Sequence, residues 1–225
     1  MSALLTARDV TYFFGNTPAL RGADLTVDAG EVLAVLGPSG SGKSTLLHCA
    51  AGILPPKTGS VHYRGVDLAG LDDRRRSDLR LREFGFVFQF GQLIDELTCL
   101  ENVSLPLRLL GQGRRSADET ARTWLDRLGV PDVAGQRPGQ VSGGQAQRIA
   151  VARALAHRPA VIFADEPTGA LDSLQGEQVM RLLVEAVRET DAALVLITHD
   201  TRIAAYSDRE IVVRDGRTSE TRSAA

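Results

Sequence analysis

The stretch from Gly37 to Thr45 reads GPSGSGKST and fits G-x-x-x-x-G-K-[ST], the pattern of a phosphate-binding loop. The apolar run VLAVL at 32–36 leads directly into it, and a helix signal from Ser44 to Ala51 follows it. A continuous apolar run predicts a strand that is buried on both faces. The order strand, glycine-rich loop, helix is the context in which this pattern indicates a nucleotide site rather than a chance turn.

Each part of this loop suits the binding of phosphate. Glycines let backbone N–H groups turn toward phosphate oxygens, and the Lys43 ammonium adds positive charge at the β- and γ-phosphates. The Ser44 hydroxyl can ligate Mg²⁺, and the start of the following helix adds its positive dipole. The candidate nucleotide-binding residues of the loop are Gly37, Pro38, Ser39, Gly40, Ser41, Gly42, Lys43, Ser44 and Thr45.

The composition is typical of a globular protein, with 225 residues, 43% of them hydrophobic and 24% charged. The net charge of -2 argues against nonspecific binding to nucleic acid, because phosphate backbones select for excess Lys and Arg. Two cysteines, Cys49 and Cys99, cannot build a disulfide framework, which favours a reducing cytosol. The N-terminus has no signal-peptide pattern and no long apolar run follows, so we expect another chain to supply any membrane part.

Strand and helix signals alternate along the chain and predict an α/β core with a parallel sheet. The apolar runs at 161–164 and 194–197 are typical of buried strands, whereas residues 91–140 carry mainly helical signals. Residues 211–217 predict a hairpin with an Asp-Gly turn. The residues from about 218 to 225 are expected to form a loose tail.

Polar side chains follow three of the predicted strands. Asp165 and Glu166 end one strand, where one carboxylate can hold Mg²⁺ and the other can polarise an attacking water. His199 and Gln89 follow two others. Because parallel strands present their carboxyl ends at one edge of a sheet, we expect His199 near Lys43 and Glu166. A neutral imidazole there can contact a γ-phosphate or position water, and a glutamine amide oxygen can ligate Mg²⁺ or its water.

The stretch VSGGQ at 141–145 predicts a second helix start that is open to an anion. Ser142 can cap the helix, while Gly143 and Gly144 leave its first N–H groups uncovered. An ordinary helix cap is the alternative interpretation of these residues when they are taken alone.

Taken together, the motifs resemble those of the nucleotide-binding domain of ABC transporters over about residues 4–217. GPSGSGKST resembles Walker A, VSGGQ resembles the LSGGQ signature with Val141 in place of leucine, and VIFADEP resembles Walker B with Glu166 at the catalytic glutamate. Gln89 falls at the Q-loop position. Asp172, in GALD, falls in the D-loop, and His199 matches the switch histidine.

This resemblance implies a single domain over 1–225, with a P-loop NTPase core of mostly parallel sheet and flanking helices. An N-terminal antiparallel β subdomain and a helical signature subdomain, inserted at about 91–157 in the RecA-like core, complete it. ATP and Mg²⁺ are the implied cofactors, with Ser44, Gln89 and Asp165 as metal ligands.

The resemblance also implies a homodimer in which Walker A of one copy and the signature of the other enclose the same ATP. Glu166 and His199 are then catalytic. Phe14 is the implied adenine-stacking residue, and Tyr12 is the alternative. The remaining nucleotide-binding residues are Gln89, Ser142, Gly143, Gly144, Gln145 and Asp172.

A finer resemblance is to the bacterial ATPases of lipoprotein-releasing, macrolide-export and antimicrobial-peptide-export systems. It rests on LRGADL, GPSGSGKSTLLH, FVFQFGQLIDELTCLENVSLPL and ADEPTGALDS. It implies a cytoplasmic ATPase, peripheral on the inner face of the cell membrane, with a separate permease docking near residues 90–105 and no nucleic-acid partner. Phe90-Gly91-Gln92 departs from the usual small residue, Phe and Asn. The alternatives are the ATPase of a signalling complex and a non-transport ABC ATPase acting on ribosomes or DNA.

Overall fold

The computed structural model describes residues 3–89 and 91–221, so Phe90 lies outside the described residues. The chain divides into two compact units. Unit one holds residues 1–80 and 193–225, and unit two holds residues 81–192. Strands and helices alternate in both, which confirms the α/β class predicted from the sequence.

Unit one begins with an antiparallel sheet whose strand order is β2-β1-β4-β5. Gly15, with a φ of +59°, makes the tight connection between the first two strands. Apolar residues alternate along β1, so that Leu5, Ala7 and Val10 are buried while the opposite face is more exposed. The strands are β1 (Leu5–Phe14), β2 (Thr17–Val27), β4 (Thr58–Tyr63) and β5 (Val66–Asp67).

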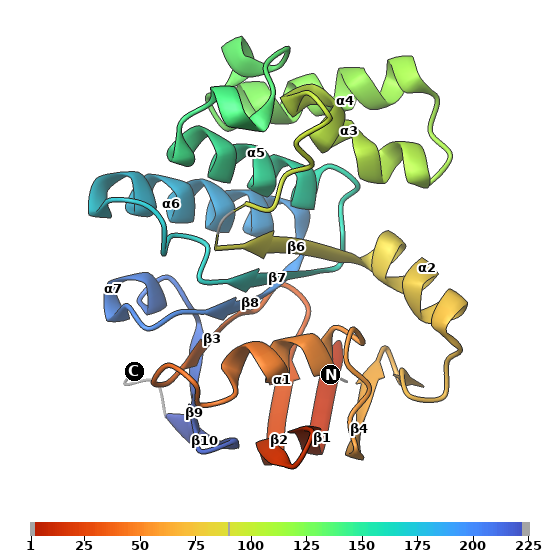
Figure 1. Cartoon of the computed structure of the whole chain (residues 1–225), viewed down its shortest axis with the longest axis vertical. Helices are drawn as coiled ribbons and strands as arrows, with labels where there is room; N and C mark the ends of the chain where they lie inside the picture. The colour runs from red at the N-terminus through yellow and green to blue at the C-terminus, as the bar shows by residue number, and fades with distance from the viewer. Residues whose placement is uncertain (1–2, 90, 222–225) are drawn as a thin grey trace. The chain divides into compact units, whose positions relative to one another are not determined.

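The second sheet region of unit one is built around β3 (Val32–Leu36), which is apolar throughout and almost fully buried. It pairs in parallel with β8 (Ala193–Ile197) on one side and with β9 (Arg209–Arg214) on the other. Helix α1 (Lys43–Ala50) lies beside β1 and β2 (Figure 1). The short α7 (Thr201–Ala204) follows β8, and α2 (Asp73–Glu83) contains the boundary between the units.

The expected hairpin is present, but the expected loose tail is wrong for residues 218–221. Residues Arg217–Thr221 form β10, which pairs antiparallel with β9. Asp215 and Gly216 both have positive φ, the conformation of a tight Asp-Gly turn whose twist matches that of the strands. The Thr218 hydroxyl accepts a hydrogen bond of 2.7 Å from the Asp24 N–H, which ties the start of the tail to another strand.

Unit two contains two parallel strands, β6 (Phe84–Phe88) and β7 (Val161–Asp165), and four complete α-helices within its described residues. Aromatic side chains of these two strands form part of the core of unit two, with 5.2 Å between the ring centroids of Phe84 and Phe163. The helices are α3 (Cys99–Leu109), α4 (Arg114–Arg127), α5 (Gly143–Leu155) and α6 (Ser173–Thr190). Helices α3, α4 and α5 pack on one another, and α5 also lies beside α6 (Figure 1).

Cys49 and Cys99 are buried free thiols, and burial raises the pKa of Cys49 to about 12. Among the residues that the structure describes, every helix is too short or too polar to cross a bilayer.

Candidate functional site

The glycine-rich loop of unit one connects β3 to α1 in a conformation that requires glycine. Gly37 has a φ of +147°, and a Cβ added there would lie 2.2 Å from the carbonyl oxygen of Val213. Lys43 is only 7% exposed. Its ammonium donates hydrogen bonds of 2.9 Å to the carbonyl oxygens of Gly37 and Pro38. The loop is therefore wrapped around the lysine ammonium.

Uncommitted hydrogen-bonding groups lie in the same loop. The Ser41 hydroxyl is buried and has no hydrogen-bond partner within the described residues. Gly42 caps α1 without a side-chain hydrogen bond, so the first N–H groups of the helix have no capping side chain. A Cβ on Gly40 would meet nothing within 4 Å, and Ser44 is exposed. An open loop with free donors around an ammonium suits a polyphosphate.

His199 follows the end of β8, at the same edge of the sheet from which the glycine-rich loop leaves β3. β3 and β8 are parallel neighbours, with Val35 opposite Ile197, and the Thr198 N–H donates to the Val35 carbonyl at 3.3 Å. The His199 side chain is exposed. The next residue, Asp200, caps α7, and hydrogen bonds from Arg202 lower the pKa of its carboxyl.

Phe14 lies at the end of β1 and is 57% exposed. The ring of Tyr12 lies edge-on to it, with 5.0 Å between the centroids. Because Phe14 is the more exposed of the two, it has more free ring surface on which a base could stack.

In unit two, Gln89 and Glu166 follow paired strand ends. Phe88 of β6 lies opposite Asp165 of β7, so the residues after both strands start at one edge. Glu166 has a φ of +46°, a left-handed conformation that costs a residue other than glycine roughly 1–3 kcal/mol. Such strain is typical of residues whose side chain must be aimed at a site. A Cβ on Gly169 would lie 2.7 Å from the Gln89 amide nitrogen. The Gln89 side chain therefore packs closely on the loop that follows Glu166.

The signature stretch forms the start of α5. The Ser142 hydroxyl accepts from the Gln145 N–H at 3.2 Å, and the Gln145 amide oxygen accepts from the Ser142 N–H at 2.9 Å. This reciprocal pair is a capping box, so the ordinary helix cap is present. The N–H groups of Gly143 and Gly144 make no hydrogen bond within the described residues. The cap and an open anion site are thus compatible.

Two residues of α5 that the motifs did not predict hold the backbone before and after Gln89. The Gln147 side chain, 2% exposed, donates to the Phe88 carbonyl at 2.9 Å. Arg153 donates to the carbonyl oxygens of Gln92 and Gly91, both at 2.8 Å. Burial lowers the pKa of the Arg153 guanidinium, although arginine stays charged in proteins. A signal was available, because Gln147 lies on the apolar stripe of a helix, where a polar group needs a partner.

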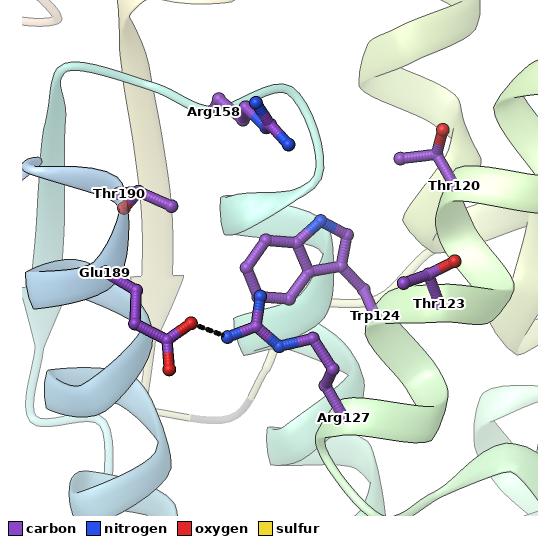
Figure 2. A pocket seen from close by; sticks show the side chains of 7 residues that line it. All are labelled: Thr120, Thr123, Trp124, Arg127, Arg158, Glu189 and Thr190. Carbon is purple, nitrogen blue, oxygen red and sulfur yellow. Dashed lines mark hydrogen bonds and ion pairs between the residues drawn. The ribbon is translucent and has the colours of Figure 1, made fainter.

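A cavity of about 470 Å³ in unit two contains none of the predicted site residues (Figure 2). The Arg127 guanidinium lies 4.5 Å from the centre of the Trp124 ring and pairs with Glu189. The residues that line the cavity are Thr120, Thr123, Trp124, Arg127, Arg158, Glu189 and Thr190. The motif residues therefore lie elsewhere, on the loops at strand ends and at the start of α5.

Residues 20–169 match the family model described as ABC transporter. The lipoprotein-releasing system ATP-binding protein LolD 2 of Caulobacter vibrioides is 46% identical over 90% of this chain and 89% of its own length. LolD of Porphyromonas gingivalis is 39% identical over 95% of this chain and 97% of its own.

The similar solved structures are likewise an ATP-binding cassette and a part of an ABC transporter complex. A dimeric ATP-binding cassette in a post-hydrolysis state with ADP and Pi has a TM-score of 0.89 and 37% identity, covering 98% of this chain and all of the other. The cbiO1 protein of Clostridium perfringens, part of the ABC transporter complex cbiONQ, has a TM-score of 0.86 and 30% identity, covering 97% of this chain and 88% of its own.

Proposed function

Because this chain belongs to the ABC transporter family and is an ATP-hydrolysing subunit of it, we propose that it powers the release of lipoproteins by a separate membrane permease. The observation that carries this proposal is the 46% identity to a lipoprotein-releasing ATP-binding protein over nine-tenths of the chain. The chain would act as a peripheral subunit on the cytoplasmic face of the cell membrane, because the permease supplies the membrane-spanning part.

The residues of the glycine-rich loop bind the phosphates of ATP in this proposal. The Lys43 ammonium exchanges its carbonyl partners for phosphate oxygens, and the Ser41 hydroxyl gains the partner that it lacks. The N–H groups at the start of α1 add further donors. Phe14 offers its exposed ring to the adenine. A buried, unpaired hydroxyl beside a lysine is costly unless a ligand completes it.

Mg²⁺ fits the oxygen donors that the chain offers. Among the described residues there is no group of three or more His, Cys, Asp or Glu that would form a metal cage. Mg²⁺ is normally held by one or two carboxylates together with substrate phosphates, so this donor set is suitable. We propose Ser44, Gln89 and Asp165 as its protein ligands. When bound, the ion neutralises charge on the β- and γ-phosphates.

Glu166 is the proposed base for hydrolysis. The oxygen of water attacks the γ-phosphorus, the bond to the bridging oxygen breaks, and ADP and phosphate leave. The Glu166 carboxylate orients the water and takes its proton, and the strained backbone at this residue aims the carboxylate. His199 contacts the γ-phosphate and senses its presence.

Two copies of the chain enclose two ATP molecules in this proposal. The uncovered N–H groups of Gly143 and Gly144, together with Ser142, bind the γ-phosphate held by the Lys43 loop of the partner. The dimeric cassettes among the similar solved structures support this arrangement. We further propose that the helices within about 91–157 form the helical signature subdomain.

The surface near residues 90–105 is the proposed permease contact. Asn102 is fully buried and orders this loop, because its side chain accepts from the Ile94 N–H at 2.7 Å and donates to the Ile94 carbonyl at 3.0 Å. Ile94 itself is 39% exposed, which leaves an apolar side chain at the surface of a well-ordered loop. We propose that the exposed Ile94 side chain on this hydrogen-bonded loop contacts the permease.

Replacing Glu166 with Gln tests the catalytic part of the proposal. We expect hydrolysis to fall by at least about 10²-fold, as for loss of a general base, and an ATP-bound dimer to accumulate on size-exclusion chromatography. Glu177→Gln, at an exposed position of α6, is the matched control and should keep full turnover. Wild-type turnover in Glu166→Gln would remove the mechanism.

Reconstitution with the permease tests the substrate. The complex in liposomes should release a bound lipoprotein only with ATP and only with Glu166 intact. Release of a peptide or drug instead, or ATP-dependent regulation without any release, would overturn the lipoprotein assignment. Salt-sensitive binding to RNA or DNA would favour the non-transport alternative.

A further inference from the structure

The two glycines of the signature stretch lie in opposite surroundings. A Cβ added to Gly143 would have as its nearest neighbour only Leu171 Cδ2, at 4.0 Å, and Gly143 is exposed. A Cβ added to Gly144 would lie 2.1 Å from the amide oxygen of Gln175, and Gly144 is buried. The second glycine therefore packs on a side chain of the same protein molecule.

The amide nitrogen of the same Gln175 side chain is held by Asp172. Its Nε2 donates a hydrogen bond of 2.6 Å to Oδ2 of Asp172, and its backbone N–H donates to Oδ1 at 2.9 Å. Asp172 is the N-cap of α6 and lies in the loop that follows Glu166. Turns tie this loop together, since the Gly169 N–H donates to the Glu166 carbonyl at 3.0 Å. One amide thus contacts both the cap of α6 and the start of α5.

We propose that Gln175 is a positioning residue for ATP hydrolysis, which links the loop after Glu166 to the signature residues through Asp172 and Gly144. The inference rests on the proposed role of the signature stretch. When the amide is in place, the start of α5 sits at a fixed distance from the Asp172 cap. Gly144 must be glycine because only an unsubstituted Cα leaves room for the tethered amide.

The tether makes the packing consequential. A Cβ does not approach an oxygen to within 3.0 Å, so an alanine at 144 forces Gln175 to move. A free glutamine would rotate away at little cost. Here rotation breaks a hydrogen bond to a carboxylate, which is stronger than a bond between neutral groups. Gly144→Ala therefore uncouples the Asp172 cap from the signature residues.

A double-mutant cycle on ATP turnover tests this. Gly144→Ala should lower kcat about tenfold or more. In the Gln175→Ala background the same change should cost less than about twofold, because the clash is gone. Gln175→Ala alone keeps the backbone bond that caps α6, and should lower kcat a few-fold while leaving the affinity of the monomer for ATP unchanged. An equal loss from Gly144→Ala in both backgrounds would show that the glycine answers to the nucleotide alone and would overturn the inference.

Two further variants separate the tether from simple space filling. Gln175→Glu keeps the size of the side chain but places a second carboxylate beside Asp172, so kcat should fall as in Gln175→Ala. Wild-type kcat in Gln175→Glu would contradict the tether. Gly143→Ala, whose Cβ meets no side-chain oxygen, should have the same effect on kcat with or without Gln175. Failure of this cycle while Glu166→Gln still abolishes turnover would sink the inference and leave the proposed function standing.

Discussion

Removal of the Arg153 guanidinium should loosen the backbone at Gly91 and Gln92. Arg153 is the side chain that binds the carbonyl oxygens of Gly91 and Gln92, with two hydrogen bonds of 2.8 Å. The Gly91 N–H is itself bonded to the Phe88 carbonyl at 3.0 Å, so its exchange with solvent reports on opening of this turn. We therefore expect Arg153→Ala to raise the rate of hydrogen exchange at Gly91.

The magnitude follows from the bonds lost. A hydrogen bond to a charged group contributes roughly 1.5–3 kcal/mol net, so the loss of both costs about 3–6 kcal/mol at most. Gln92 is exposed, and water can replace its bond, which favours the lower end of this range. About 3 kcal/mol corresponds to an open population larger by roughly 10²-fold. Arg153→Lys keeps the charge but not the planar fork, so its effect should be about half as large in free energy.

The assay is amide exchange on the intact chain, read at Gly91 by NMR or in the peptide that contains it. Arg181→Ala, on an exposed position of α6, is the matched control and should leave this exchange unchanged. ATP turnover is the second measurement, and it should fall in Arg153→Ala because Gln89 loses its ordered surroundings. Unchanged protection of Gly91 in Arg153→Ala would refute the reasoning.

Two other predictions concern the glycine-rich loop and a half-buried histidine. Gly37→Ala should abolish ATP binding, measured by calorimetry, because its Cβ would overlap the Val213 carbonyl at 2.2 Å. Retained affinity would contradict this. Burial lowers the pKa of His157 below its usual 6.5, whereas its hydrogen bond to the Phe84 carbonyl opposes the shift. The unfolded chain then takes up the proton first, so His157 contributes stability above about pH 6.5 that is lost as pH falls through the folded pKa. The denaturation midpoint of His157→Gln should depend less on pH in this window, and an unaltered dependence would rule out the assignment.

The sequence by itself determined the family, the α/β class and the identity of the motifs. A phosphate-binding loop can be read in this way because its donors are backbone N–H groups of one contiguous stretch, set by glycines at fixed spacing. Buried strands are equally legible, since β3 is a continuous apolar run and β7 is one up to its last residue, Asp165. The Asp-Gly turn at 215–216 is local for the same reason. The second strand of this hairpin was expected to end at about Arg217 but continues to Thr221, where Thr218 is also bonded by the distant Asp24.

Only the tertiary structure decided which side chains hold the motifs in place. Gln147 and Phe88 are 59 positions apart, and Arg153 and Gln92 are 61 apart, so no local pattern connects them. The packing of Gln175 on Gly144 likewise depends on where α5 and α6 come together. The left-handed backbone of Glu166 is imposed by its surroundings, because the residue does not prefer that conformation. The groups that bind phosphate or take up a proton belong to short contiguous stretches of the chain. The positions of these groups depend on contacts that form only when distant segments fold together.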